Sequence, residues 1–288
     1  MFETIRQELF FAPEEFAERL RKIRTVMARR GIDTILCPSP ENIYYGSGFQ
    51  TFGIQNYAML VIPQEKDPFL ILRYLESIQA HRYSWVRDVV TWDDLDDPAV
   101  VTVRELQRRG LAGGTLGVEE RSFFFQVANW RKLKDAVPRL VDGTGVVEAV
   151  RAVKSPRELD YMREAARLTD IGLAAAVEEA REGRSDNDIA AAIFERMTRA
   201  GAEWLARDPI VTSGVRSGLP HSCYMRQTLK PDDAILLEFS GVYHRYYAPI
   251  MRGLVIGRGN ALVERMASIC VEALNAAIAR VGPGATSG

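Results

Sequence analysis

The chain has 288 residues, 47% hydrophobic and 26% charged, and its 37 Lys and Arg against 38 Asp and Glu leave a net charge of −1. This composition is typical of a globular protein long enough for two domains, so it excludes a disordered chain. The sequence has no basic block that would neutralise phosphates, and no run near the roughly 18 apolar residues that span a bilayer. We therefore expect neither nucleic acid nor membrane as a partner.

The three cysteines, Cys37, Cys223 and Cys270, are odd in number and lack CxxC spacing. Such usage favours small buried side chains in a reducing compartment over a disulfide framework. The N-terminal segment mixes acids with its apolar residues and lacks the continuous apolar run of a secretion signal. We therefore expect a cytoplasmic protein.

The first half of the sequence predicts a mixed α/β domain over residues 1–150. An amphipathic helix begins at Pro13, with apolar residues at helical spacing, and Gly31 ends it. Short apolar runs typical of strands follow at Thr34–Pro38, Tyr57–Pro63, Phe69–Tyr74, Asp88–Trp92 and Thr115–Val118, with helices expected over Pro98–Arg109 and Phe123–Ala136.

The second half predicts another domain over residues 151–288. Pro156 suits the first turn of a long helix that reaches about Glu182. Ser185 caps the next helix, with Asp188 as a short-armed capping box. Strands are expected at Pro209–Ser213, Ala234–Ser240 and Tyr246–Ile256, and a last helix at Ala261–Val281. The pattern favours an antiparallel sheet backed by helices, in an α/β (α+β) protein.

The segment Asp208–Gly253 carries the residues most suited to chemistry. His221 lies alone in a Gly/Pro-rich turn, GLPHSCY, and the apolar run AILLEF holds one acid, Glu238, where we expect a buried side chain. An unpaired buried charge is unfavourable, so Glu238 requires a cationic partner, a proton or a substrate. Arg252 on the next predicted strand is one such partner.

The end of the chain hints at an internal repeat. The last predicted helix runs into VGPGATSG, much as the earlier long helix runs into AREGRSDND. Helix ends of this kind are also common without a repeat. If the repeat is real, residues 151–288 hold the first half of the second domain, and its second half lies past Gly288.

Several motifs in order resemble the creatinase, aminopeptidase P and prolidase superfamily. They are RAVKSPRELDYMREAARLTD, SDNDIAAAIFERM, IVTSG followed by LPH, and LKPDDAILLEFSGVYHRYYAPIMRG. The earlier segment ERLRKIRTVMARRGIDTILCPSPENIYYGSGF is similar to the N-terminal domain of the same group. The resemblance implies a creatinase-type N-terminal domain followed by a partial "pita-bread" catalytic domain.

The departures from this family concern its metal ligands. Metal-dependent members bind two divalent ions with an aspartate where this chain has Glu238, a second aspartate where it has Pro249, and a histidine and two glutamates further downstream. A two-metal site needs several ligands fixed in geometry, and one carboxylate supplies too few. We therefore expect no bound metal and no cofactor.

The position of His221 matches the active-site histidine of the family. In creatinase-like members, which lack the metals, this residue is taken to act as the acid and base. An imidazole titrates near neutrality, so it can take a proton from water and return it to a leaving nitrogen. We predict His221 as the catalytic residue; the alternative is a structural, hydrogen-bonded loop histidine.

Five further residues are predicted to bind substrate. Glu238 would hold a cationic group, Arg252 offers a planar fork for a carboxylate, and either Tyr246 or its neighbour faces the concave side of the sheet. In the family the N-terminal domain can reach the active site of the partner subunit in a homodimer, so Phe49 and Tyr57 would line a shared pocket. The alternative for those two is an ordinary loop packed over its own domain.

These observations predict a metal-independent hydrolase of a C–N bond in a small amino-acid-like or amidine-like molecule, as a homodimer. Creatinase-like enzymes carry a glutamate where this chain has Met251, so creatine is a doubtful substrate. One alternative is a metal-dependent Xaa-Pro aminopeptidase or dipeptidase. Another is a non-catalytic pita-bread module that binds a ligand.

Overall fold

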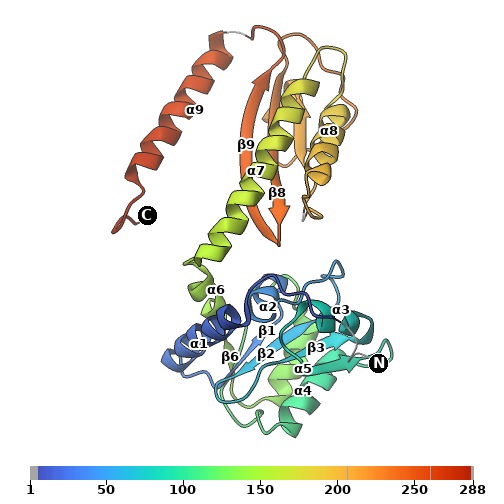
Figure 1. Cartoon of the computed structure of the whole chain (residues 1–288), viewed down its shortest axis with the longest axis vertical. Coiled ribbons are helices and arrows are strands. Elements are labelled where there is room, and N and C mark those ends of the chain that lie inside the picture. Colours follow the sequence, from blue (N-terminus) through green and yellow to red (C-terminus); the bar gives the residue numbers. More distant parts are fainter. Residues whose placement is uncertain (1–5, 206, 260, 287–288) are drawn as a thin grey trace. The chain divides into compact units, whose positions relative to one another are not determined.

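The computed structural model describes residues 6–205, 207–259 and 261–286. The chain divides into two compact units, residues 1–154 (unit 1) and residues 155–288 (unit 2), each with its own sheet (Figure 1). Within the described residues, every helix is too short or too polar to cross a lipid bilayer.

Unit 1 is built around a six-stranded mixed sheet with the order β4-β3-β2-β1-β5-β6. β1 pairs antiparallel with β2 and parallel with β5. Its strands are β1 (Thr34–Cys37), β2 (Met59–Pro63), β3 (Phe69–Arg73), β4 (Val89–Trp92), β5 (Leu116–Val118) and β6 (Leu140–Asp142). Its helices are α1 (Pro13–Arg29), α2 (Pro40–Ser47), the 3-10 turn η1 (Tyr74–Glu76), α3 (Ser77–Tyr83), α4 (Pro98–Arg108), α5 (Val127–Ala136) and α6 (Val146–Arg151).

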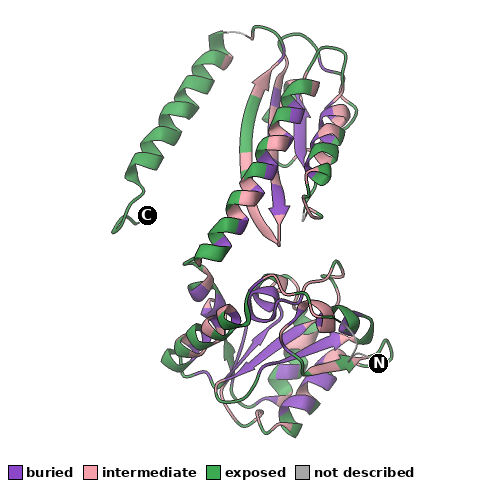
Figure 2. Ribbon diagram, in the orientation of Figure 1, coloured by how far each residue is buried: buried purple, intermediate pink, exposed green. Residues whose placement is uncertain are grey.

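Helices cover both faces of this sheet. Apolar side chains from α1, α2, α3 and α6 pack on one face, and those from α4 and α5 pack on the other. β1 and β2 are buried along their whole length (Figure 2). Continuous apolar strands such as TILC and MLVIP are what a sheet covered on both faces requires.

The strongly periodic elements of unit 1 form as predicted. α1 buries Phe16, Ile23 and Met27, and Gly31 follows it with a φ of 65°. The short elements α2, α6 and β6 were not predicted, because one or two turns of helix or three residues of strand carry too little periodicity to recognise.

Unit 2 is a three-stranded antiparallel sheet with helices. Its strand order is β7-β8-β9. The elements are α7 (Pro156–Glu179), α8 (Asp186–Arg199), β7 (Ile210–Ser213), the 3-10 turn η2 (Gly214–Gly218), β8 (Ala234–Tyr243), β9 (Tyr246–Val255) and α9 (Ala261–Arg280). The predicted capping box of Ser185 with Asp188 is confirmed, and the structure shows a second one, of Ser155 with Glu158, at the predicted start of α7.

α7 and α8 pack on the same face of this sheet, through a core that includes Ala176, Ile193 and Leu237. Gly241 allows α7 to approach closely, because a Cβ there would meet the carbonyl oxygen of Ala165 at 2.6 Å. α9 buries none of its described side chains (Figure 2). The fold class is confirmed: a mixed α/β unit followed by an antiparallel sheet backed by helices.

Candidate functional site

The sheet of unit 2 has two unlike faces. Ile235, Leu237 and Phe239 of β8 are buried in the core with α7 and α8. Side chains alternate along a strand, so the even-numbered residues of β8 lie on the other face. We call this the open face; by strand register it carries Ile210 and Thr212 of β7, Leu236, Glu238 and Ser240 of β8, and Tyr247, Pro249 and Met251 of β9.

Glu238 lies on the open face between two apolar neighbours, Ile210 on β7 and Met251 on β9. The expectation that it is buried in the apolar core is wrong, because the odd-numbered residues of β8 fill that core. Its side chain is half-buried and makes neither a hydrogen bond nor an ion pair with any described residue. The carboxylate is therefore available to a ligand.

Arg252 does not pair with Glu238. Arg252 lies opposite Leu237 and shares its face of the sheet, whereas Glu238 lies on the other face. Its guanidinium donates to the neighbouring carbonyl oxygen of Met251 at 2.9 Å. The structure thus separates Arg252 from the open face.

His221 lies in the loop between β7 and β8, shortly after η2. His221 is exposed and has a φ of 56°, in the left-handed region. The imidazole makes no hydrogen bond to any described residue, so the alternative of a hydrogen-bonded structural histidine does not hold. η2 itself packs against β8. His221 stays the predicted catalytic residue.

Three polar side chains around this loop were missed by the sequence reasoning. Asp186 is fully buried and Arg216 contacts it. Thr212 is also fully buried, and its Oγ1 has no hydrogen-bond partner among the described residues. Thr212 lies opposite Leu236 on the open face, diagonal to Glu238. Asp186 looks in the sequence like an ordinary acid of a first helical turn, and only its contacts in the structure show that it lies at this loop.

Of the two adjacent tyrosines on β9, Tyr247 and not Tyr246 lies on the open face. Tyr246 pairs with Tyr243 on the helix-covered face, where its hydroxyl donates to Oε1 of Glu158 at 2.8 Å. Its ring also packs against that of Tyr161 of α7, with centroids 5.9 Å apart. Tyr246 therefore ties the hairpin to α7, and its predicted role with a substrate loses its geometric basis.

Phe49 and Tyr57 are core residues of unit 1, with exposed fractions of 2% and 9%. The hydroxyl of Tyr57 contacts Oγ1 of Thr102 at 2.7 Å, and burial raises its pKa. The alternative of a loop packed over its own domain thus describes both residues. Within the same loop Phe52 is 74% exposed.

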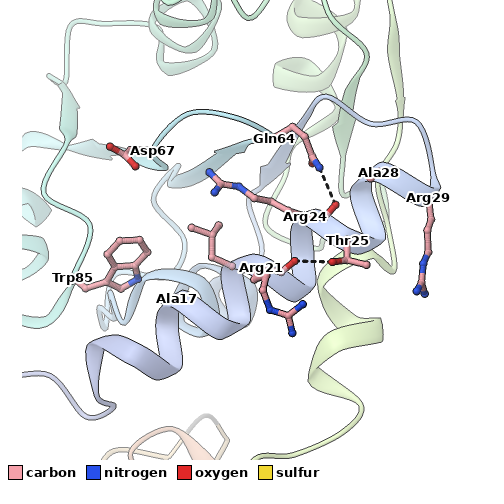
Figure 3. A pocket seen from close by; sticks show the side chains of 10 residues that line it. Ala17, Arg21, Arg24, Thr25, Ala28, Arg29, Gln64, Asp67 and Trp85 are labelled. Carbon is pink, nitrogen blue, oxygen red and sulfur yellow. Dashed lines mark hydrogen bonds between the residues drawn. The ribbon is translucent and has the colours of Figure 1, made fainter.

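Unit 1 also holds a groove along α1, lined by residues that include Leu20, Arg24, Gln64 and Trp85 (Figure 3). Nε of Arg24 donates to the carbonyl oxygen of Pro63 at 3.1 Å, and Nε2 of Gln64 donates to that of Arg24 at 3.2 Å. These polar groups hold α1 to the end of β2. None of the predicted site residues lines the groove, so the open face of unit 2 is the candidate site.

Two family models match the chain: the creatinase/prolidase N-terminal domain over residues 19–153, and metallopeptidase family M24 over residues 160–288. The chain belongs to the creatinase, aminopeptidase P and prolidase superfamily. This M24 chain is 26% identical to the ectoine hydrolase of Halomonas elongata, over 97% of its length and 75% of the relative's. It is 29% identical to the creatinase of a Bacillus species, over 85% of its length and 61% of the relative's.

The solved structures agree with the predicted superfamily and fold. The prolidase from Pyrococcus horikoshii superposes with a TM-score of 0.79 at 26% sequence identity. This match covers 93% of the M24 chain and 73% of the prolidase. The chain is therefore a member of a family of hydrolases.

The name of family M24 implies a metal, and the described residues of the open face do not fit one. Glu238 is flanked by Ile210 and Met251, and Pro249 lies opposite Ser240, where no side chain offers a carboxylate. In the described ranges, no three His, Cys, Asp or Glu side chains are grouped so that they could hold an ion. A divalent cation needs several oxygen or nitrogen ligands in fixed geometry, which this donor set lacks.

Proposed function

We propose that this M24 member hydrolyses a C–N bond in a small amino-acid-like or amidine-like molecule, without a bound metal and with His221 as general acid and base. The observation that carries the proposal is Pro249 on the open face. A proline side chain cannot ligate a metal, and it stands where the resemblance puts a metal-binding aspartate. The similarity to ectoine hydrolase and creatinase supports the same reaction class.

In the proposed reaction the imidazole of His221 takes a proton from a water molecule. The water oxygen bonds to the carbon of the C–N bond, the C–N bond breaks, and the proton passes to the leaving nitrogen. The imidazole returns to its neutral form, so no further reactant is needed. Proton transfer of this kind contributes about 10²–10⁴-fold in rate.

Glu238 supplies the charge that selects the substrate. Its carboxylate lies between apolar neighbours and has no cationic partner among the described residues. A cationic amidine-like group fits this position, because it would neutralise the carboxylate and accept the apolar contacts of Ile210 and Met251.

Turnover measurements on the purified protein test the proposal. Ectoine, creatine and glycyl-proline are offered in EDTA and again with added Mn²⁺. We expect turnover of ectoine that EDTA leaves unchanged, and little turnover of creatine. Stoichiometric manganese, cobalt or zinc in the active protein would overturn the metal-free mechanism.

A metal-dependent Xaa-Pro dipeptidase is the second candidate, favoured by the similarity to the prolidase from Pyrococcus horikoshii. It requires that glycyl-proline is cleaved, that EDTA abolishes cleavage and that Mn²⁺ restores it. Ectoine binding in calorimetry without turnover of any of the three compounds would instead identify a non-catalytic binding module.

We also propose that two copies of the chain associate through unit 1. Oε2 of Glu76 in η1 accepts a hydrogen bond from Thr51 at 2.6 Å, which holds the Phe52 loop against η1. Exposed apolar side chains gather on these segments: Phe52, Ile54, Tyr74, Leu75 and Ile78. Such a patch favours a protein interface. Sedimentation velocity should show a dimer that the double change of Phe52 and Leu75 to Asp dissociates.

A further inference from the structure

The loop that carries His221 is anchored, on the side that follows His221, by one buried carboxylate. Asp186, the first residue of α8, is fully buried. Its Oδ2 accepts a hydrogen bond from the backbone N–H of Met225 at 3.0 Å, and its Oδ1 accepts one from that of Gln227 at 2.9 Å. Both donors lie just past His221 in the chain. The positive end of the α8 dipole favours the negative charge of Asp186.

Arg216 closes the loop from the other side of His221. Its Nη1 lies 3.5 Å from Oδ2 of Asp186. Its Nη2 donates to Oγ of Ser222 at 2.9 Å and to the carbonyl oxygen of Cys223. Ser222 and Cys223 directly follow His221, so the planar guanidinium joins the segment before His221 to the segment after it.

The position of the His221 imidazole is set by the backbone of its loop. His221 makes no side-chain hydrogen bond to a described residue, and its φ of 56° is one that residues other than glycine rarely adopt. Such a conformation persists only where the surrounding structure determines it. The backbone N–H of Ser222 donates to the carbonyl oxygen of Leu219 at 3.4 Å, which closes a turn around His221, and Asp186 and Arg216 hold the chain on either side of that turn.

We infer that Asp186 and Arg216 are positioning residues for His221: they clamp the β7–β8 loop so that the imidazole is presented in one orientation. This inference rests on the proposed catalytic role of His221. The clamp acts through the loop and does not touch the substrate, so its loss lowers kcat and leaves KM nearly unchanged. A misplacement of about 1 Å can reduce a rate by about 100-fold.

The first measurement follows the imidazole itself. The chain has 3 histidines, so histidine-selective NMR gives few signals, and His221→Gln assigns the one from His221. We expect Asp186→Asn to shift or broaden that signal and leave those of His81 and His244 unchanged. Asn cannot accept both backbone N–H bonds, because only one of its two terminal atoms is an acceptor. Asp160→Asn, an exposed acid of α7, is the matched control.

The second measurement is kinetic, on whichever of ectoine, creatine and glycyl-proline the protein turns over. We expect Asp186→Asn and Arg216→Gln to lower kcat by about 10–100-fold with KM changed by less than about threefold. Arg216→Lys should fall between wild type and Arg216→Gln, since an ammonium cannot donate along the same fork. Arg196→Gln, an exposed arginine of α8, should change neither constant.

The outcomes separate the clamp from the proposed function. Full activity of His221→Ala would remove the proposed function, whatever the clamp variants do. An unchanged His221 signal in both folded clamp variants would overturn the clamp, even if His221 is essential. If Asp186→Asn fails to fold, by circular dichroism, Arg216→Gln and Arg216→Lys still decide between these outcomes.

Discussion

Two acids, one in each unit, occupy contrasting environments. Glu119 follows β5 in unit 1, where both faces of the sheet are covered, and it is 2% exposed. It accepts hydrogen bonds from the backbone N–H of Ser39 at 3.1 Å and from Nδ2 of Asn42 at 2.7 Å, and burial raises its pKa. Glu238 lies on a face that α7 and α8 do not cover. Unit 1 thus uses its buried acid to hold its own fold, whereas unit 2 leaves an acid available for a ligand.

We expect the largest change from His221→Ala, which tests whether the catalytic residue lies in unit 2. Replacing His221 by Ala should reduce turnover by about 10²–10⁴-fold, because the acid and base of the proposed reaction is lost. The melting temperature should stay the same, since the exposed imidazole makes no hydrogen bond or ion pair with a described residue. His81→Ala, in unit 1, is the matched control for kcat. Retention of most activity in His221→Ala would contradict the assignment.

The acid of unit 1 should matter for stability instead. Asn42 is fully buried; its Nδ2 donates to Glu119 and to Glu148, at 2.7 and 2.8 Å, and its Oδ1 accepts from Arg151 at 2.7 Å. Asn42→Ala leaves these groups without that partner, so we expect a loss of about 3 kcal/mol in the free energy of unfolding. Urea unfolding measures it, with the exposed Asn275→Ala as control. A loss below about 1 kcal/mol would show that the network is not structural.

Glu238→Gln tests whether the acid of unit 2 serves substrate binding and not stability. The amide keeps the shape and removes the charge, so KM for a cationic substrate should rise by about 10–100-fold. Stability should change by less than about 0.5 kcal/mol, because no described residue relies on this carboxylate. Steady-state kinetics and a thermal melt check both, beside the exposed Glu178→Gln. A large loss of stability with an unchanged KM would make Glu238 a structural acid like Glu119.

The smallest effect concerns Glu203, an acid of unit 2 that does have partners. Burial opposes its ionisation, but the side chain of His244, whose Nδ1 lies 3.3 Å from Oε1, and the charge and Nε hydrogen bond of Arg245 at 2.8 Å outweigh it and lower its pKa. Its stabilisation is therefore complete above its ordinary pKa of 4.5 and disappears as the pH falls through the lowered value. Glu203→Gln should reduce stability by about 1 kcal/mol at pH 7.

Melting temperatures of wild type and Glu203→Gln between pH 3 and pH 7 test this sign. The gap between the two proteins should narrow as the pH falls below 4.5. A gap that widens with acid would contradict it. Glu195→Gln, exposed on α8, should follow the wild type throughout.

The sequence predicted what depends on local pattern. The period of α1, Pro156 at the start of α7, the capping box at Ser185 and the order of the motifs identified the family, the fold class and the loop of His221. The site residues were harder, because a face is decided by register. Glu238 was expected in the core, but the odd-numbered residues Ile235, Leu237 and Phe239 of β8 face the core and Glu238 faces the other way. Tyr246 could not be distinguished from Tyr247 without the pairing of β8 and β9.

Contacts between distant segments could not be predicted from the sequence. Asp186 contacts backbone groups about forty positions away, at Met225 and Gln227. Phe49 and Tyr57 were predicted to line a shared pocket, since nothing local shows that the helices of unit 1 enclose them. Such contacts follow from tertiary packing, which overrides local pattern.

The tight turn at His244 and Arg245, both with positive φ, has a consequence for the order of assembly. It lets β8 and β9 pair over ten positions with almost no chain between them, so their loop-closure entropy is small. β7 reaches β8 only after the chain of residues 214–233 has closed. The hairpin can thus form early in folding, and β7, which places Ile210 opposite Glu238, joins afterwards.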